Sequence, residues 1–195
     1  MDSLNRKILV VFLVLLVLDL LVRIWGSRED IGPANLEHLS LDPAAVSAVE
    51  ISVAEERLVF ERTPRGFELA GENAKTGPAD GQGTNRKLLE PEASREVEAF
   101  LERICSMVRE FIEEDIGDRT PTFGLDPGQA VMVRLHWKGG RETKAPFTVR
   151  FGTNLPLNVM YVYASFDDTP RLYKVLKTYR DSATALLHSF SSPGP

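Results

Sequence analysis

The sequence predicts an α+β domain built on an antiparallel sheet and held behind an N-terminal transmembrane helix. A nearly uninterrupted apolar run occupies residues 8–25. Segments in which apolar and polar residues alternate, as half-buried strands require, then follow one another in two groups joined by turn residues. Each group is followed by a segment with an apolar stripe of helical period. We therefore expect two meander-plus-helix units that pack their helices over the sheet.

The chain has 195 residues, which is room for an anchor and one domain of ordinary size. We expect a membrane anchor at residues 1–26 and an exposed neck at residues 27–40. The α+β domain then occupies residues 41–190 and contains a flexible, glycine-rich insert near residues 71–90.

The predicted anchor runs from Ile8 to Trp25 and is interrupted only by Asp19 and Arg23. As a helix it is roughly 27 Å long, close to the thickness of the hydrocarbon core of a bilayer. Two basic residues, Arg6 and Lys7, precede it and favour a cytoplasmic N-terminus. The sequence thus predicts a single-pass membrane protein with its domain outside the cytoplasm.

Two interpretations of the charges in the anchor stay open. Asp19 and Arg23 are four residues apart, so they can pair along one helix face while Arg23 reaches toward the interface. Alternatively, Asp19 faces another membrane helix and helps to assemble a complex, because ionisable groups inside membranes are rare and often functional. A cleaved signal peptide competes with the anchor, but no small-x-small cleavage site follows the run.

The first meander is expected at residues 41–69, with three short strands separated by AEE and PRG turns. After the insert, Pro91 suits the first turn of a helix that we expect at residues 92–113. Cys105 lies at the edge of its apolar stripe and is interpreted as a packing thiol. The stripe consists of Val97, Phe100, Leu101, Ile104, Val108, Phe111 and Ile112.

The second meander is expected to have four strands, followed by a final helix near residues 176–190. A Leu-Asp-Pro tripeptide precedes the first strand of each meander, at residues 41–43 and 125–127. Asp-Pro is a common turn sequence, so this match is a weak indication that the halves are related. The expected strands are AVMVRLHW, PFTVRFG, VMYVYASF and RLYKVL.

Composition and spacing exclude several classes of function. The net charge of −5 provides no electrostatic footprint for nucleic acid. A single cysteine excludes an internal disulfide and two-cysteine zinc motifs, and no pair of the three histidines has metal-ligand spacing. No phosphate-binding loop or nucleophile elbow is present. The carboxylates of residues 111–115 could attract a divalent cation, although a solvated charge run is the ordinary explanation. We therefore expect no catalytic centre, no cofactor and no metal.

A basic patch is predicted near the last strand and the last helix. It could meet anionic lipid headgroups or an acidic partner, or it could only balance nearby acids. It consists of Arg171, Lys174, Lys177 and Arg180.

A turn FGLDPG, a strand that ends in FG and a later strand with two tyrosines follow one another in the second half. In this order the chain resembles a bacterial family of membrane-anchored domains of unknown function, often encoded beside ABC-type exporters of the gliding-motility kind. The resemblance implies an accessory envelope protein whose partners are transporter subunits, and it implies no catalytic residue. The residues that carry it are Phe123, Gly124, Leu125, Asp126, Pro127, Phe151, Gly152, Tyr161 and Tyr163.

The function expected from the sequence is a non-catalytic, membrane-anchored accessory or scaffold protein of a bacterial transporter or cell-envelope assembly. Two alternatives remain. One is an extracytoplasmic module that binds lipid or polysaccharide, which a concave pocket with a few convergent polar groups would favour. The other is an enzyme whose site is assembled from distant residues such as the carboxylates at 111–115, which two acids of raised pKa would favour.

Overall fold

The computed structural model describes residues 35–70, 86–139 and 145–191. The chain divides into two compact units, Met1–Asn35 and Leu36–Pro195, and the second unit is described below. The predicted anchor, with Asp19 and Arg23, lies outside the described residues. Within the described ranges, no helix is long and apolar enough to cross a membrane.

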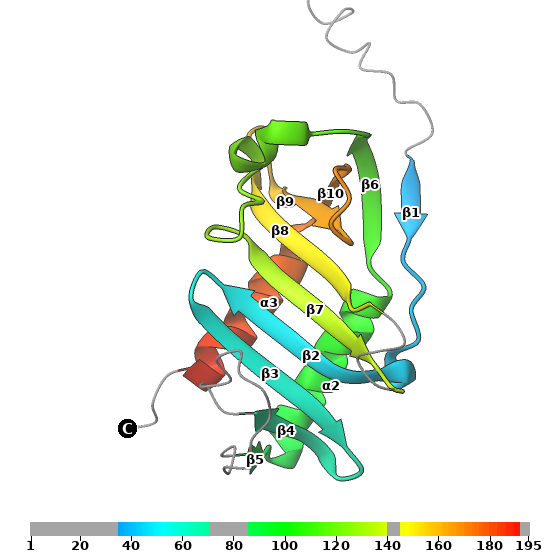
Figure 1. Ribbon diagram of the computed structural model, residues 1–195, viewed down its shortest axis with the longest axis vertical. Coiled ribbons are helices and arrows are strands. Elements are labelled where there is room, and N and C mark those ends of the chain that lie inside the picture. Colours follow the sequence, from blue (N-terminus) through cyan, green and yellow to red (C-terminus); the bar gives the residue numbers. More distant parts are fainter. Residues whose placement is uncertain (1–34, 71–85, 140–144, 192–195) are drawn as a thin grey trace, which may run out of the picture. The chain divides into compact units, whose positions relative to one another are not determined.

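The described residues form one antiparallel sheet of 10 strands, in the order β1-β6-β10-β9-β8-β7-β2-β3-β4-β5 (Figure 1). This confirms the predicted α+β class with an antiparallel sheet. The strands are β1 (Leu36–His38), β2 (Val46–Val53), β3 (Glu56–Thr63), β4 (Gly66–Ala70), β5 (Arg86–Leu88), β6 (Val108–Glu113), β7 (Val131–Trp137), β8 (Phe147–Leu155), β9 (Asn158–Phe166) and β10 (Leu172–Leu176).

Strands that are consecutive in the chain pair with each other in two meanders, β2 to β5 and β7 to β10, and β2 pairs with β7 to join them. The two Leu-Asp-Pro turns lead into the two strands of this central pair. Asp42 caps the short helix η1 (Pro43–Ala45), since its Oδ1 accepts a hydrogen bond from the Ala44 N–H at 2.9 Å. The Asp126 carbonyl accepts from the Ala130 N–H at 2.8 Å, just before β7.

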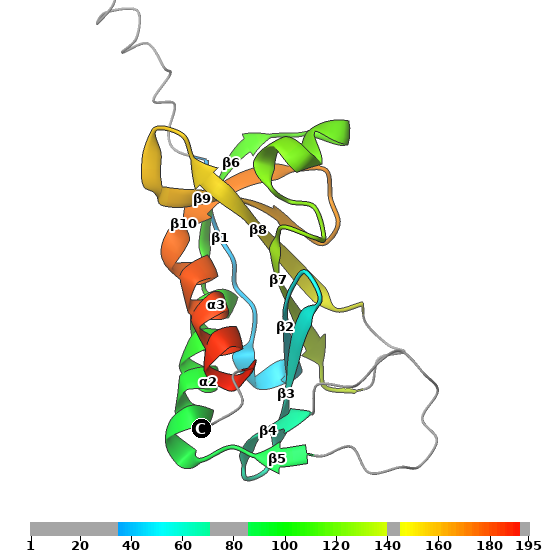
Figure 2. The ribbon, with the colours of Figure 1, turned by 90° about the vertical axis from the view of Figure 1, so that its left-hand side faces the viewer.

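Helices α2 (Pro91–Cys105) and α3 (Lys177–Ser191) lie on the same side of the sheet (Figure 2). Each follows its meander, as the sequence predicts. Leu101 of α2 and Leu187 of α3 belong to the same buried apolar cluster as Ile51 and Val133 of the central strands. One sheet face is thereby covered, and in the described part of the chain no α-helix covers the other face of β2, β3 and β7.

The prediction of one helix to residue 113 is wrong. The helix ends at Cys105, and Val108–Glu113 form β6, between β1 and β10. Val108 and Phe111 lie at sequence spacings that would continue the apolar stripe of the helix, although both residues belong to β6. The sequence VREFIE does not alternate as a half-buried strand does; it forms a strand because its backbone pairs with β1 and β10, whose residues are distant in the chain.

The last part of the predicted neck and of the predicted insert contains strands, β1 and β5. Residues 36–38 form β1, where Glu37 pairs with Arg109 of β6 at 2.8 Å. The Leu39 N–H then donates to the Met107 carbonyl, so this part of the predicted neck belongs to the sheet. Residues 86–88 form β5 against β4, and Leu89 is buried. Both are three-residue edge strands, too short for their alternation to be recognised locally.

The residues that carry the family resemblance pack against one another. The ring of Phe123, at the end of the short helix η2 (Gly117–Phe123), meets the ring of Tyr163 edge to face, with centroids 4.9 Å apart. A Cβ at Gly152 would lie 2.1 Å from the Phe123 carbonyl oxygen, so only glycine fits there. Gly124 has a φ of +67°, which favours glycine as well. These residues have a packing role.

Candidate functional site

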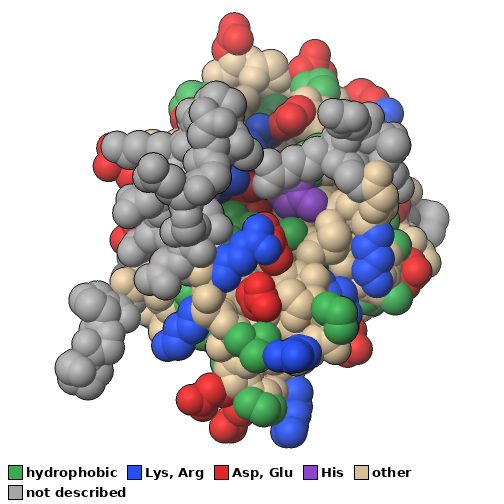
Figure 3. All heavy atoms as spheres, turned by 60° about the horizontal axis from the view of Figure 1, so that its bottom comes forward, with side chains coloured by type: hydrophobic (Ala, Val, Ile, Leu, Met, Phe, Trp, Pro, Cys, Tyr) green, Lys and Arg blue, Asp and Glu red, His purple; other side chains and the backbone are tan. Residues whose placement is uncertain are grey.

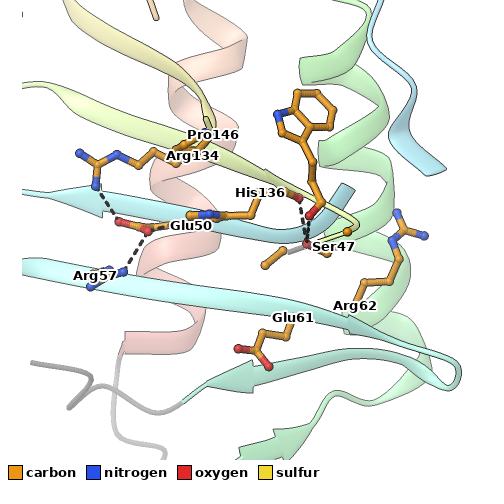
Figure 4. A pocket seen from close by; sticks show the side chains of 11 residues that line it. Ser47, Glu50, Arg57, Glu61, Arg62, Arg134, His136 and Pro146 are labelled. Carbon is orange, nitrogen blue, oxygen red and sulfur yellow. Dashed lines mark hydrogen bonds and ion pairs between the residues drawn. The ribbon is translucent and has the colours of Figure 1, made fainter. Parts of the chain in front are cut away.

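A cluster of charged side chains lies on the sheet face opposite the helices. The residues on either side of Glu50 in β2 face the helices, so Glu50 projects to the other face. In the register of the sheet, Glu50 lies opposite Arg134 of β7. His136 follows on the same face of β7, and Arg57 reaches Glu50 from β3. We call these four residues the Glu50 cluster (Figure 4).

Both carboxylate oxygens of Glu50 accept from cations. Arg57 Nη2 donates to Oε2 at 2.9 Å, and Arg134 Nη1 donates to Oε1 at 3.1 Å. The His136 Nε2 atom lies 3.3 Å from Oε2. Because an ionised carboxylate only accepts hydrogen bonds, Nε2 carries the proton in this contact. The Glu50 side chain is only 4% exposed, while the two arginines remain partly exposed at the surface.

The lowered pKa of Glu50 keeps its carboxylate ionised at neutral pH. Burial by itself raises the pKa of a carboxyl, but the hydrogen bonds from His136 and Arg57 and the charges of Arg57 and Arg134 outweigh it. The result is a pKa of about 2. Glu50 is therefore a fixed negative charge that orients two guanidinium groups, and it cannot exchange a proton near neutral pH.

A shallow pocket of about 540 Å³ opens over the Glu50 cluster. Arg62, Trp137 and Pro146 also line it. Ser47 fixes the end of β7 beside the pocket, because its Oγ donates to the His136 and Trp137 carbonyls at 3.1 and 3.0 Å. Basic and acidic side chains intermingle around a histidine on the surface that Figure 3 shows. Such a pocket can hold an anionic or strongly polar group against the exposed sides of the arginines.

The polar character continues over β8 and β9 on the same face. Ser52, Thr148 and Ser165 are buried polar residues of β2, β8 and β9. Arg150 of β8 pairs with Asp168, which lies in the turn after β9. Polar side chains of β2, β7 and β8 thus lie on this face, whereas toward β9 and β10 it carries a small apolar cluster that includes Tyr163, Leu172 and Phe123 of η2.

The predicted basic patch lies at β10 and the beginning of α3, and its cations have acidic partners. Arg171 donates through Nε and Nη2 to Glu114 Oε1, at 2.8 and 2.6 Å. The charge of Glu114 and these hydrogen bonds raise the pKa of Arg171 further. Lys174 on β10 pairs with Glu110 on β6 at 2.8 Å. Arg171 and Lys174 therefore each neutralise a glutamate that lies in β6 or directly after it.

The other two members of the patch belong to the first turn of α3. Lys177 pairs with Asp181, one turn further along the helix. Arg180 donates to the Gly152 carbonyl and to Asn154 Oδ1, both at 2.9 Å, and lies 3.5 Å from Asp181. Arg180 thus ties the helix to β8. Each of the four cations of the predicted patch thus has an acidic or carbonyl partner.

The carboxylates of residues 111–115 do not converge. Glu113 pairs with Arg119, Glu114 with Arg171, and Asp115 Oδ1 accepts from the Gly117 N–H at 2.9 Å. Within residues 35–70, 86–139 and 145–191, no group of His, Cys, Asp and Glu is arranged to hold a metal ion.

Cys105 is a buried thiol of α2. Burial, and secondarily the negative charge of Asp42, raise the pKa of Cys105 to about 11, so the thiolate is scarce at neutral pH. This geometry agrees with the expected packing role.

The Glu50 cluster was not predicted from the sequence. The available signal was a charged residue beside buried apolar residues in each of three strands: Glu50 in VEISV, Arg57 in RLVFERT and Arg134 in VMVRLHW. The registers of β2 against β3 and against β7 bring these residues together, and the register between β2 and β7 depends on the tertiary structure.

Comparisons with protein-family models, with curated proteins and with solved structures found no match to the chain.

Proposed function

We propose that this chain is a membrane-anchored, non-catalytic accessory protein of a bacterial cell-envelope assembly, and that the uncovered face of its sheet binds a subunit of an ABC-type transporter. The observation that carries the proposal is the Glu50 cluster, where a buried carboxylate that is ionised at neutral pH holds two partly exposed arginines in fixed positions. The anchor and the transporter partner rest on the sequence and on the family resemblance.

The chemistry of the cluster supports recognition over catalysis. An arginine held by a carboxylate is pre-organised, so less side-chain entropy is lost when a partner binds it. Complementary charges at such a surface provide specificity and speed association. The groups with large pKa shifts, Glu50 at about 2 and Cys105 at about 11, lie far from the range in which acid–base catalysis at neutral pH operates.

Photo-crosslinking in native membranes tests the proposal. A photoreactive residue at Met132, on the same face of β7 as Arg134, should crosslink to a transporter subunit that mass spectrometry identifies. The matched control is the same residue at Glu96, an exposed position on α2. Equal crosslinking from both positions, or none from Met132, contradicts a binding surface on the open face.

A charge variant makes the test specific to the Glu50 cluster. Arg57→Gln should lower the crosslinking yield from Met132 several-fold, because it removes a guanidinium that the partner contacts. Arg86→Gln is the control, since Arg86 pairs with Glu61 at the β5 edge, outside the cluster. An unchanged yield in Arg57→Gln means that the cluster only stabilises the fold.

The pocket favours a second candidate, the binding of an anionic polysaccharide. Its arginines and the Trp137 side chain provide the charged and aromatic contacts that such a ligand uses. Addition of an anionic oligosaccharide to the full chain should then change tryptophan fluorescence saturably, and Arg134→Gln should abolish the change. The first candidate predicts no saturable change with the sugar.

A further inference from the structure

Three apolar side chains that are close together in the sequence are exposed at the tip of the β8–β9 hairpin. Leu157 is 101% exposed, Val159 66% and Met160 59%. The same two strands bury Phe151 and Val162 closer to the centre of the sheet. Figure 2 shows the hairpin projecting beyond the sheet and the beginning of α3. Single exposed apolar residues are ordinary, but a cluster of them on a projecting turn indicates a site that contacts a membrane or another protein.

The hairpin is held firmly by its surroundings. Arg180 of α3 donates to the Gly152 carbonyl and to Asn154 Oδ1, both at 2.9 Å, in the part of β8 that leads to the tip. At the tip, Asn158 Oδ1 accepts from the Met160 N–H at 3.1 Å and closes the turn. The apolar tip is therefore presented in a defined position.

Cations and further apolar groups flank the tip. Lys174 Nζ lies 5.6 Å from the centre of the Tyr161 ring, and Leu176, paired with Tyr161 in the sheet, is exposed as well. Lys177 and Arg180 follow at the beginning of α3. These three cations outnumber the two carboxylates that pair with them, those of Glu110 and Asp181. An apolar tip with an aromatic ring and surplus positive charge at its base matches the interface of a bilayer with anionic lipids.

The number of residues between the proposed anchor and the folded unit limits how far that unit can lie from a membrane. The proposed anchor ends at residue 26, and Leu36 begins the folded unit. Residues 27–35, even fully extended, span at most about 30 Å. Figure 2 shows that the hairpin projects toward the end of the unit where β1 begins. With the anchor of the proposed function in a bilayer, this length of chain keeps the folded unit close enough for an exposed apolar tip to contact the same bilayer.

We propose that residues 157–160 of the hairpin insert into the interfacial layer of the membrane, while Lys174 and Lys177 face anionic lipid headgroups. The domain then has two attachments to the bilayer, which fix its orientation and direct the Glu50 cluster consistently toward the partner. This inference rests on the membrane anchor of the proposed function.

Fluorescence quenching in lipid vesicles tests the inference. The full-length Leu157→Cys variant is labelled with an environment-sensitive dye and reconstituted into vesicles of phosphatidylcholine and phosphatidylglycerol that carry nitroxide lipids. Cys105 is buried and stays unlabelled. We expect a shift of dye emission to shorter wavelength and quenching by the nitroxide lipids. Both effects should weaken in pure phosphatidylcholine, at high salt and in Lys177→Gln, because they depend on attraction to the anionic lipid.

The control is Arg65→Cys, in the β3–β4 turn, which lies at the opposite end of the unit in Figure 1. Its dye should remain exposed to water. If the protein floats with the vesicles but position 157 behaves as position 65 does, the hairpin inference is wrong and the anchor stands. If position 157 is shielded from aqueous quenchers without quenching by nitroxide lipids, a protein covers the tip and lipid does not. If the protein fails to float with the vesicles at all, both the anchor and the hairpin inference are wrong.

Discussion

Glu50 carries a full charge on a side chain that is almost completely buried. Ionising such a group is expensive in the absence of partners, and Arg57, Arg134 and His136 compensate that cost. A cluster of this kind contributes little net stability compared with apolar residues, yet it is costly to break, because removal of one partner leaves the other charges unpaired. Its retention at the centre of an apolar sheet agrees with a role in recognition.

We expect Glu50→Gln to lower the free energy of unfolding at pH 7 by about 3 kcal/mol, because two arginines lose their counter-charge. The pKa of Glu50 is about 2 in the folded chain and near 4.5 in the unfolded chain. Its stabilisation is therefore complete above pH 4.5 and is lost as the pH falls toward 2. The variant should lack this part of the acid dependence.

Denaturant unfolding from pH 7 to pH 2 measures the effect. Glu61→Gln is the matched control, because Glu61 lies on β3 but forms a more exposed pair with Arg86. It should change the stability by less than about 1 kcal/mol. An equal free energy of unfolding of Glu50→Gln and the wild-type protein at pH 7 would contradict the prediction, because it would show that the charge of Glu50 does not stabilise the fold.

At the scale of elements, helix α3 and the strands of both meanders agree with their predicted positions. The wrong assignments concern β6, which was predicted as the end of a helix, and the edge strands β1 and β5. In each case the deciding interaction is a backbone pairing with a partner distant in sequence, such as Lys174 of β10 opposite Glu110 of β6. Side-chain periodicity within one segment contains no information about such pairing.

The contact between η2 and β8 leads to a prediction at the same scale. Gly152→Ala places a Cβ 2.1 Å from the Phe123 carbonyl oxygen, a backbone atom that cannot move without displacing η2. We expect a loss of about 3 kcal/mol or more in thermal or denaturant unfolding. Gly128→Ala is the control, because nothing lies within 4 Å of its Cβ position, and it should change stability by less than about 0.5 kcal/mol. Similar losses in both variants would contradict the close approach at Gly152.

At the scale of the whole described unit, the two meanders share one sheet and one core. The β2–β7 pairing joins them, and α2 and α3 both pack on the same apolar cluster. Neither meander has a separate core of comparable size. The unit should therefore unfold as one cooperative body, despite its repeated arrangement of strands and helix.

Hydrogen exchange tests this cooperativity. Val49→Ala, in the fully buried centre of β2, should lower the protection of β3 and of β8 and β9 by the same amount, about 2 kcal/mol. The edge strands β1 and β5 should exchange faster in both proteins, because they pair on one side only. Reduced protection confined to the first meander would show that the two halves are independent folding units.

The sequence by itself determined the α+β class, the two meanders and the two amphipathic helices, because alternation and helical spacing are properties of single segments. The tertiary structure alone decided where α2 ends, that both meanders form one sheet, and that Glu50, Arg57 and Arg134 meet. Strand register sets those contacts, and it is established between segments as far apart as β2 and β7. A charged residue in an apolar strand is visible in the sequence, but its partner becomes visible only when the strands are paired.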